Sequence, residues 1–448
     1  MRRDTAAARK IAELLEKVLA TPLGERLTLA AEIAGQRGTR VYLVGGAVRD
    51  LYLTGEIRDL DLLVASDGIS FAGEMARRLD GRLEVHREFL TAEIVDRQGA
   101  RIDLVSARTE TYPEPAALPV VAPGRVEEDL ARRDFTVNAL AVSLDPEARF
   151  ELLDPFNGGR DLEDRLLRVL HEDSFCDDPT RILRGVRLEH RLGLTLEPRT
   201  EGLAREAVDE GIFRRLSGAR LRRELALLLG ESGPVESRID RLAALGLLKV
   251  LHPELELTDE LRELLRRVDA ERRRYERPGG PDFPIRAWRL HLLALAWSLS
   301  ASERQELAER LQLAGDPQRR LVGSAERVRE ALGGLSRGAA RPHEIDALLW
   351  RLDAEEIVLL TALGDRKVTE RVEHWLGELR GFQLAITGGS LVARGVAPGP
   401  GIGRALQATR EARLDGVIGA AEELEFALAR LHREGLVAVD RSTSKDGR

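Results

Sequence analysis

The stretch "VYLVGGAVRDLYLTGEIRDLDLLVASDG" (residues 41–68) decides the fold of the N-terminal part of this chain. An apolar run ends at Gly45 and Gly46, and a second apolar run begins at residue 59. Short apolar runs bounded by glycine and polar turns are typical of buried strands. We therefore expect a strand, a glycine turn that opens a helix, and then a second strand.

The second run carries two carboxylates, Asp59 and Asp61, on either side of Leu60. On a strand both would leave the same face, roughly 6–7 Å apart at their Cα atoms. Like charges held this close are destabilising unless a cation lies between them. Mg²⁺ prefers one or two carboxylates plus substrate phosphates, and Asp103 in "RIDLVSARTETY" is a candidate third carboxylate. Two acids on a strand also occur without a metal, so this motif alone leaves both interpretations open.

The glycines that precede the carboxylates favour a phosphate-binding function. Gly45 and Gly46 would let the backbone approach a triphosphate closely. Arg49, one helical turn further on, can reach either phosphates or Asp50. A structural turn with an Arg–Asp pair remains the alternative for this stretch. Together with the paired carboxylates, however, the turn predicts phosphoryl or nucleotidyl transfer with Mg²⁺ as cofactor.

Composition limits the class of protein. The chain of 448 residues is too long for one ordinary core, and its 43% hydrophobic and 32% charged residues fit a globular protein. A net charge of −7 argues against coating nucleic acid, but basic clusters at 214–225 and 262–280 could grip phosphates locally. Solvated helix faces are the alternative for both clusters.

The location of the protein is predicted from what the sequence lacks. No apolar run approaches the roughly 20 residues of a membrane span. The N-terminal segment carries Asp4, Glu13 and Glu16, so it is typical of an amphipathic helix and not of a signal peptide. One cysteine, Cys176, excludes an internal disulfide. We expect a cytoplasmic protein.

The chain divides into a mixed α/β part and an all-α part. Between about 39 and 150, five apolar stretches alternate with turns, which predicts about five strands. From about 160 onward apolar residues recur at helical spacing, and "ERPGGPDFP" (276–284) could link two domains. The predicted fold class is therefore α+β.

Three segments carry a family resemblance: "GGAVRD…RDLDLLV" (45–64), "EEDLARRDFTVNALA" (127–141) and "DDPTRILRGVRL" (177–188). In this order they resemble successive motifs of the class II tRNA nucleotidyltransferases, the CCA-adding enzymes, and of the related bacterial poly(A) polymerases. The resemblance implies a nucleotidyltransferase head with a mixed, mainly antiparallel sheet, followed by a helical neck, body and tail. We expect an N-terminal helical segment at 1–38, the head at 39–150, the neck at 151–230, the body at 231–365 and a tRNA-binding tail at 366–448.

The same resemblance implies roles for individual residues. Asp59 and Asp61 would be the metal ligands and catalytic residues, and Asp103, the candidate third carboxylate identified above from its strand, is expected to join them in catalysis. Asp134 would accept from the ribose hydroxyls and so favour NTP over dNTP. The remaining residues expected to bind nucleotide are Gly45, Gly46, Arg49, Arg132, Arg133, Asn138, Asp178, Arg181 and Arg184.

The pattern of hydrogen-bond donors and acceptors on each base shows, independently of the resemblance, how an Asp–Arg pair could select nucleotides. Cytosine and adenine each present an amine beside an unprotonated ring nitrogen, which suits a carboxylate beside a guanidinium. Uracil and guanine would leave buried groups unpaired, at about 1–3 kcal/mol each. Asp178 and Arg181 are i and i+3, so we expect them to share a helix face, although a structural ion pair is the alternative. Arg187 and Arg191 extend the same row, either toward the RNA primer or on a salt-bridged surface.

The expected activity is addition of C, C and A to the 3′ end of tRNA from CTP and ATP, with neither membrane nor DNA as partner. A-addition alone and poly(A) tailing share these motifs. The long stretch between Asp103 and Arg132 could contain a mobile loop and disfavours CC-addition alone. A catalytically silent RNA-binding protein is the alternative from another class.

Overall fold

The computed structural model describes residues 6–57, 59–148, 150–337 and 341–434. These residues form two compact units. The first unit comprises the described residues up to Gly233 together with Ser237–Glu256, and the second comprises Pro234–Glu236 and the described residues from Leu257 onward. Each unit has its own core and is described separately.

The first unit is built around a seven-stranded sheet with the strand order β3-β4-β5-β2-β1-β8-β9. All neighbouring strands are antiparallel except β2 and β5, which are parallel. The bounds of the strands are β1 Val41–Val44, β2 Leu60–Val64, β3 Arg82–His86, β4 Thr91–Val95, β5 Arg101–Ser106, β8 Ala141–Ser143 and β9 Leu152–Leu153. The predicted α+β class with a mixed, mainly antiparallel sheet is confirmed.

The apolar runs of the sequence form the centre of this sheet. Every residue of β1 is buried, as expected for a strand covered on both faces. In β2, Leu60 and Leu62 are buried while Asp61 between them is half-buried, so the predicted alternation holds. Strand β2 begins at Leu60, so Asp59 precedes the strand instead of lying within it.

The first unit has more strands than the five that the sequence predicts, because the main sheet has seven and two further pairs lie outside it. A two-stranded hairpin, β6 (Arg108–Thr111) with β7 (Val120–Pro123), lies in the stretch expected to contain a mobile loop. A second pair, β10 (Leu166–Leu167) with β11 (Thr195–Leu196), is parallel. These short strands escape prediction because two to four residues give no reliable alternating pattern.

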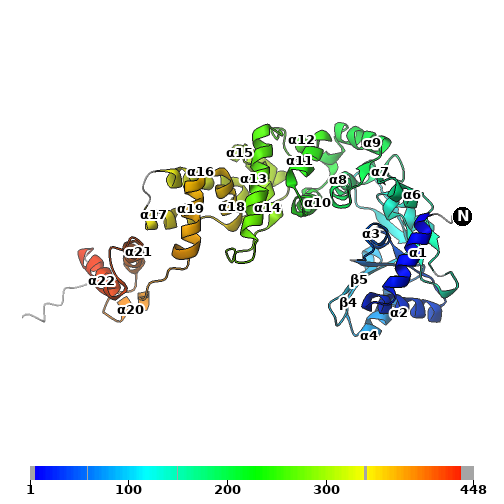
Figure 1. Cartoon of the computed structure of the whole chain (residues 1–448), viewed down its shortest axis with the longest axis horizontal. Coiled ribbons are helices and arrows are strands. Elements are labelled where there is room, and N and C mark those ends of the chain that lie inside the picture. The colour runs from blue at the N-terminus through cyan, green and yellow to red at the C-terminus, as the bar shows by residue number, and fades with distance from the viewer. Residues whose placement is uncertain (1–5, 58, 149, 338–340, 435–448) are drawn as a thin grey trace, which may run out of the picture. The chain divides into compact units, whose positions relative to one another are not determined.

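Helices cover the sheet and continue into a helical region of the same unit (Figure 1). Helix α4 packs against β4 and β5, α1 packs on α3, and α8 packs on α10. The bounds are α1 Ala6–Val18, α2 Pro22–Arg37, α3 Gly46–Thr54, α4 Gly68–Leu79, α5 Val126–Ala131, α6 Gly158–Glu163, α7 Ser174–Asp177, α8 Thr180–Leu192, α9 Pro198–Asp209, α10 Gly218–Gly230, α11 Val235–Ala244 and α12 Leu247–Leu251.

The second unit is helical throughout its described residues. Helix α13 packs against α14 and α18, and the C-terminal part forms a separate apolar cluster around Leu391, Ala427 and Leu431. The bounds are α13 Asp259–Tyr275, α14 Ala287–Leu295, α15 Ala301–Arg310, α16 Asp316–Ser336, α17 Pro342–Leu349, α18 Ala354–Leu363, α19 Arg366–His374, α20 Gly388–Val392, α21 Pro400–Leu414 and α22 Glu423–Arg433.

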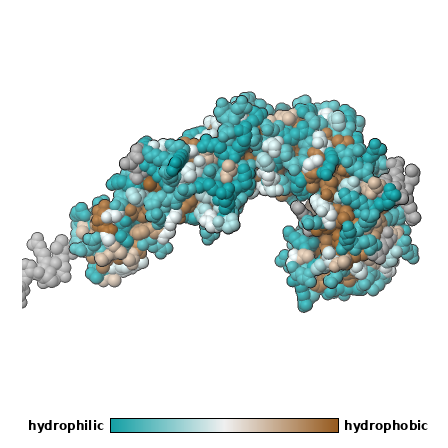
Figure 2. All heavy atoms as spheres, viewed as in Figure 1, coloured by the Kyte–Doolittle hydropathy of each residue, from teal (hydrophilic) through white to brown (hydrophobic). Residues whose placement is uncertain are grey.

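The segment 276–284, expected to link two domains, lies inside the second unit, and the chain passes between the units near residues 233–257. The finer division at residues 38, 150, 230 and 365 stays a prediction. The visible face in Figure 2 is mostly hydrophilic, with hydrophobic residues gathered in patches. Among the described residues, no helix combines the length and apolar character needed to span a membrane.

Candidate active site

The glycine turn and the carboxylate strand meet at one edge of a cleft in the first unit. The cleft has a volume of about 520 Å³. Its described lining carries nine arginines and four carboxylates, although the whole chain has a net charge of −7. The arginines are Arg49, Arg108, Arg132, Arg133, Arg181, Arg184, Arg187, Arg191 and Arg220, and the acids are Asp61, Glu110, Asp134 and Asp178. Such an excess of positive charge suits a polyanionic ligand.

The turn at Gly45 brings backbone and arginine together. Gly45 ends β1 with φ of 66°, a conformation that favours glycine, and Gly46 begins α3. A Cβ atom on Gly45 would lie 2.5 Å from Nη1 of Arg133, so glycine also makes room for this guanidinium. Gly46 itself lies in the wall of the cleft, as the predicted phosphate turn requires.

Arg49 and Asp134 are held by one continuous polar network. Arg49 is buried and donates to Asp50 at 2.7 Å and to the side-chain oxygen of Asn138. Asn138 in turn donates to Oδ1 of Asp134 at 2.8 Å. Arg184 Nη2 lies 2.8 Å from Oδ2 of Asp134, but no described group is aligned to donate a hydrogen bond to that buried oxygen. Oδ2 therefore keeps hydrogen-bonding capacity for a ligand that enters the cleft.

Arg132 and Arg133 are positioned by one buried acid. Asp129, which is fully buried, accepts from Arg132 at 2.6 Å and from Arg133 at 2.9 Å. Arg132 also donates to Glu110 at 2.7 Å, and Glu110 accepts from Arg108 at 2.8 Å. These pairings fix the guanidinium groups before any ligand binds, which reduces the entropy that binding costs.

The carboxylates on and next to β2 and β5 are not paired with any described cation. In the part of the chain that the structure describes, Asp59, Asp61 and Asp103 make no hydrogen bond or ion pair through their side chains. Asp61 and Asp103 are register partners across the parallel β2–β5 pair. Burial raises the pKa of Asp61 to about 7, with Asp103 and then Asp59 raising it further and Arg133 opposing them. Burial, and then Glu93, also raises the pKa of Asp103.

Two hollows meet at Asp61. Besides the arginine-rich cleft, a second hollow of about 300 Å³ lies over β2, β4 and β5, and Asp103, Glu93 and His86 are in its wall. Asp61 and Arg133 line both hollows. A reaction at Asp61 could therefore draw one reactant from each side.

Asp178 and Arg181 do not lie on one helix as expected. Helix α8 begins at Thr180, and Asp178 lies just before it in extended conformation. Oδ1 of Asp178 accepts from the backbone and hydroxyl of Thr180 at 3.0 and 2.6 Å, so Asp178 caps the helix start. Arg181 donates to the hydroxyl of Ser174 at 2.7 Å and to the carbonyl of Arg132 at 2.8 Å. Both residues nevertheless line the cleft.

Arg220 lines the cleft but is not among the residues that the sequence predicts to bind nucleotide. It belongs to α10 and donates to Oδ1 of Asp178 at 2.8 Å and to the carbonyl of Ala116 at 2.7 Å. It thus joins the start of α8 to the loop between β6 and β7. Its only sequence signal is membership of the basic cluster at 214–225. Tyr112, in the same loop, and Arg108 and Glu110, in β6, also escape prediction, because the stretch 104–131 indicates only a possible mobile loop.

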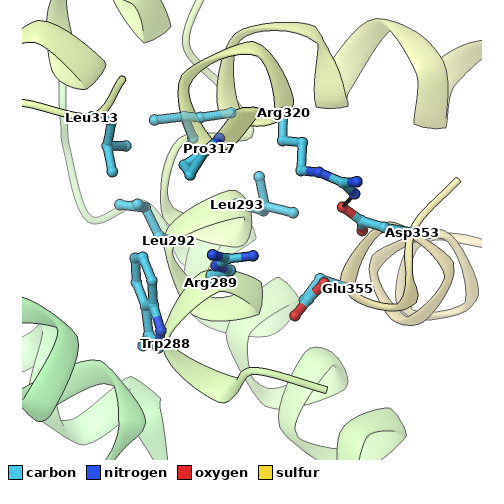
Figure 3. A pocket seen from close by; sticks show the side chains of 10 residues that line it. Trp288, Arg289, Leu292, Leu293, Leu313, Pro317, Arg320, Asp353 and Glu355 are labelled. Atoms are coloured by element: carbon cyan, nitrogen blue, oxygen red, sulfur yellow. Dashed lines mark hydrogen bonds and ion pairs between the residues drawn. The ribbon is translucent and has the colours of Figure 1, made fainter. Parts of the chain in front are cut away.

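The second unit contains a much smaller hollow among α14, α16 and α18 (Figure 3). Its volume is about 30 Å³, enough for little more than a water molecule. Arg320 and Asp353 in its wall already form an ion pair, and Glu355 accepts from the backbone of Arg286 at 2.8 Å. Of these hollows, the arginine-rich cleft of the first unit is the one lined by the predicted nucleotide-binding residues.

Comparison with known proteins identifies the family. Residues 41–168 match the family model described as the poly A polymerase head domain. The chain is 32% identical over 395 residues to the CC-adding tRNA nucleotidyltransferase of Deinococcus radiodurans, a match that covers 87% of this chain and 89% of that protein. The chain belongs to the tRNA nucleotidyltransferase family.

Solved structures of tRNA nucleotidyltransferases share this architecture. A CCA-adding enzyme in complex with ATP has 30% identity and a TM-score of 0.77, covering 96% of this chain and 99% of that one. The Thermotoga maritima CCA-adding enzyme complexed with tRNA has 30% identity and a TM-score of 0.72, covering 94% and 98%. The recognition of the family from its three motifs is thereby confirmed.

A-adding members of the nucleotidyltransferase family are also similar, but each match covers only part of the relative. The A-adding tRNA nucleotidyltransferase of Geobacter sulfurreducens is 35% identical over 414 residues, which is 91% of this chain. The chain spans 47% of the length of that relative, and 53% and 23% of the lengths of two further A-adding relatives. The chain thus spans about half or less of the curated A-adding relatives that it matches.

Proposed function

We propose that this chain adds nucleotides to the 3′ end of tRNA without a nucleic-acid template, using CTP and ATP. The observation that carries the proposal is that Asp61, in the wall of the arginine-rich cleft, lies beside Asp103 and two residues from Asp59, and that none of the three pairs with a described cation. Of the three residues, Asp61 is half-buried while Asp59 and Asp103 are exposed, so the cost of a carboxylate without a cation falls mainly on Asp61. Their presence there is reasonable if substrate and metal supply the missing positive charge.

The donor chemistry fits a divalent cation. Among the described residues, no three His, Cys, Asp or Glu side chains are grouped closely enough to hold a metal by themselves. Mg²⁺ commonly uses one or two carboxylates together with substrate phosphates, so Asp59 and Asp61 would hold it. When bound, the ion supplies charge stabilisation for the phosphate oxygens and lowers the pKa of the attacking hydroxyl.

Other residues of the chain would bind the triphosphate, the ribose, the base and the RNA. The turn at Gly46, with Arg49 and Arg133, would bind the triphosphate, and Oδ2 of Asp134 would accept from a ribose hydroxyl. The free Oδ2 of Asp178 would accept from the base amine while Arg181 donates to the ring nitrogen. The second hollow at Asp61 would receive the 3′ end of the RNA. Its hydroxyl oxygen bonds to the α-phosphorus as the bond to the β-phosphate oxygen breaks, and pyrophosphate leaves; catalysis is mainly positioning and charge stabilisation.

The nucleotides added are the point on which the relatives differ. We propose addition of C, C and A, and the alternative is addition of A alone. The A-adding names of relatives with 35%, 38% and 43% identity favour the alternative. Complexes of related CCA-adding enzymes with ATP and with CTP support the main proposal. A cytoplasmic location stays a prediction.

One experiment tests the reaction and its nucleotides together. Purified protein is incubated with tRNA lacking CCA, with tRNA ending in CC, or with an unstructured RNA, each with ATP, CTP or both. Extension of the first by C, C and A supports CCA addition, whereas extension of only the second by A supports the alternative. Tailing of the unstructured RNA would indicate a poly(A) polymerase.

The metal-binding role is tested by the double variant Asp59→Asn with Asp61→Asn, which keeps side-chain shape but removes both charges. We expect incorporation to fall by at least about 10³-fold, as for loss of charge stabilisation in other enzymes, while tRNA binding persists. Asp209→Asn, an exposed acid at the end of α9, is the matched control. Retained incorporation by the double variant would refute the metal assignment, whereas absence of incorporation by the wild type would favour a catalytically silent RNA-binding protein.

A further inference from the structure

Tyr112 is the only aromatic side chain among the described residues that line the cleft. It directly follows β6 and is half-buried. Its hydroxyl donates to Oε2 of Glu110 at 3.1 Å, and Glu110 is itself held by Arg108 and Arg132. The ring is therefore tethered at its hydroxyl end in a cleft otherwise dominated by arginine.

The ring lies at the end of the cleft where the base-reading residues lie. Its hydroxyl interacts electrostatically with Arg181, Asp178 and Arg184, besides Glu110. The loop that follows Tyr112 is anchored at the same place, because the backbone N–H of Ala116 donates to the carbonyl of Cys176 at 2.9 Å. The hydrogen bond of Ala116 and the shared lining of the cleft thus place Tyr112 near the segment that leads into α8.

A nucleobase presents one hydrogen-bonding edge and two flat faces. Asp178 and Arg181 can satisfy the edge, but neither covers a face. Stacking on an aromatic ring is the usual way for proteins to bind such a face, and its loss weakens binding by about tenfold or more per base. A ring whose orientation is fixed beforehand loses little entropy when the base arrives.

We propose that Tyr112 is the residue on which the base of the incoming nucleotide stacks. This inference rests on the proposed function, because it assumes that Asp178 and Arg181 read the base edge. A purine offers a larger face than a pyrimidine, so ATP depends on Tyr112 more than CTP does. Tyr112 thereby contributes to the balance between the two nucleotides, while Asp178 and Arg181 reject UTP and GTP.

Steady-state kinetics of Tyr112→Phe and Tyr112→Leu separate stacking from the hydroxyl contact. We expect Tyr112→Phe to raise the KM only slightly, because the stacking ring remains and only its hydroxyl tether is lost. We expect Tyr112→Leu to raise the KM for ATP about tenfold and that for CTP less, with kcat changing little. Tyr52→Leu, which alters a partly exposed tyrosine of α3 under Lys10, is the matched control. Equal impairment of the Phe and Leu variants, or no change in Tyr112→Leu, would overturn the proposal.

A fluorescence measurement detects the stack without catalysis. The four tryptophans, Trp288, Trp297, Trp350 and Trp375, all lie in the second unit. Tyr112→Trp therefore places a single reporter in the first unit. We expect its emission to be quenched on addition of ATP, and less by CTP, while wild-type emission changes little.

Equilibrium binding of ATP to the wild type and to Tyr112→Leu distinguishes failure of the proposed function from failure of the stacking role. If the wild type binds no ATP, the proposed function fails and Tyr112 has no base to stack on. If the wild type binds ATP but Tyr112→Leu binds it equally well, only the stacking role fails. Unchanged emission of Tyr112→Trp with ATP bound would likewise overturn the stacking role alone.

Discussion

Arg220 donates to Oδ1 of Asp178 at 2.8 Å and, through its other amino group, to the carbonyl of Ala116 at 2.7 Å. One guanidinium thus connects a cleft carboxylate to the loop between β6 and β7. Because Thr180 also donates to Oδ1, three donors occupy that oxygen and Oδ2 is the one left for a ligand. The orientation of Asp178 is therefore set from α10, some 40 residues further along the chain.

Arg220→Ala should reduce discrimination between nucleotides more than it reduces the chemical step. Without the guanidinium, Asp178 keeps only its contacts with Thr180 and can rotate, so its charge is less well aimed at the base. We expect the preference for CTP and ATP over UTP and GTP, measured as the ratio of kcat/KM values, to fall about tenfold, which corresponds to about 1.4 kcal/mol. Arg220→Lys should recover little, because one ammonium cannot span both acceptors in the planar geometry of arginine.

Arg223→Ala is the control for this variant, since Arg223 is exposed on the same helix. Its nucleotide preference should match that of the wild type. An unaltered preference in Arg220→Ala would show that Asp178 holds its orientation without Arg220.

Gly45→Ala should impair nucleotide binding beyond its cost in stability. The positive φ of 66° alone costs an alanine about 1–3 kcal/mol. The new Cβ would also lie 2.5 Å from Arg133 Nη1 and push that guanidinium away from the turn. We expect kcat/KM for ATP to fall at least about tenfold, by loss of one charged contact.

Gly99→Ala offers a closely matched comparison. Gly99 has φ of 81° but open space around the position of a Cβ, so the substitution adds strain without displacing a neighbour. Both variants should lose similar stability in thermal unfolding, and only Gly45→Ala should lose activity. If both retain activity, Arg133 does not act at the turn.

Protonation of Glu201 should make the first unit less stable in acid. Hydrogen bonds from Arg241, at 2.6 Å, and then from Arg205, at 2.7 Å, lower the pKa of Glu201 to about 2. A lowered folded-state pKa contributes stability that is present above about pH 4.5 and is lost as the pH falls toward 2. Allowing for partial exposure of Glu201, we expect a contribution on the order of 2 kcal/mol at pH 7.

Chemical unfolding of Glu201→Gln at several pH values checks this contribution. The difference in free energy of unfolding from the wild type should be largest at pH 6–7 and shrink steadily below about pH 4.5. Glu206→Gln is the control, because the pair of Glu206 with Arg199, at 3.5 Å, is exposed and weak. A difference for Glu201→Gln that stays constant with pH would contradict the assignment.

The head was largely predictable because its signals are local. The strands that carry Asp61 and Asp103 were visible as alternating apolar runs, and the turn at Gly45 as a break between a strand and a helix. Those patterns depend on residues that are neighbours in sequence. The parallel pairing that sets Asp61 beside Asp103 was not predictable, since the order of strands in a sheet has no local pattern.

The parts of the site that depend on long-range contacts escaped prediction. Arg220 reaches Asp178 from 42 residues away, and Tyr112 enters the cleft from a loop without a recognisable motif. The expectation that Asp178 lies on α8 failed because Pro179 follows it, and the residue before a proline is disfavoured in helical conformation. The spacing of Asp178 and Arg181 suggested that both lie on one helix face. In the structure, Asp178 instead caps the start of the helix.

The parallel pairing of β2 with β5 makes this candidate active site sensitive to the register of the two strands. Because side chains alternate between faces, sliding β5 by a single position would present Ile102 or Leu104 to Asp61 and turn Asp103 away. Lengthening the exposed turn at 97–99 leaves that register unchanged. Insertions and deletions during the evolution of this lineage should therefore accumulate in such turns and be excluded from the two strands.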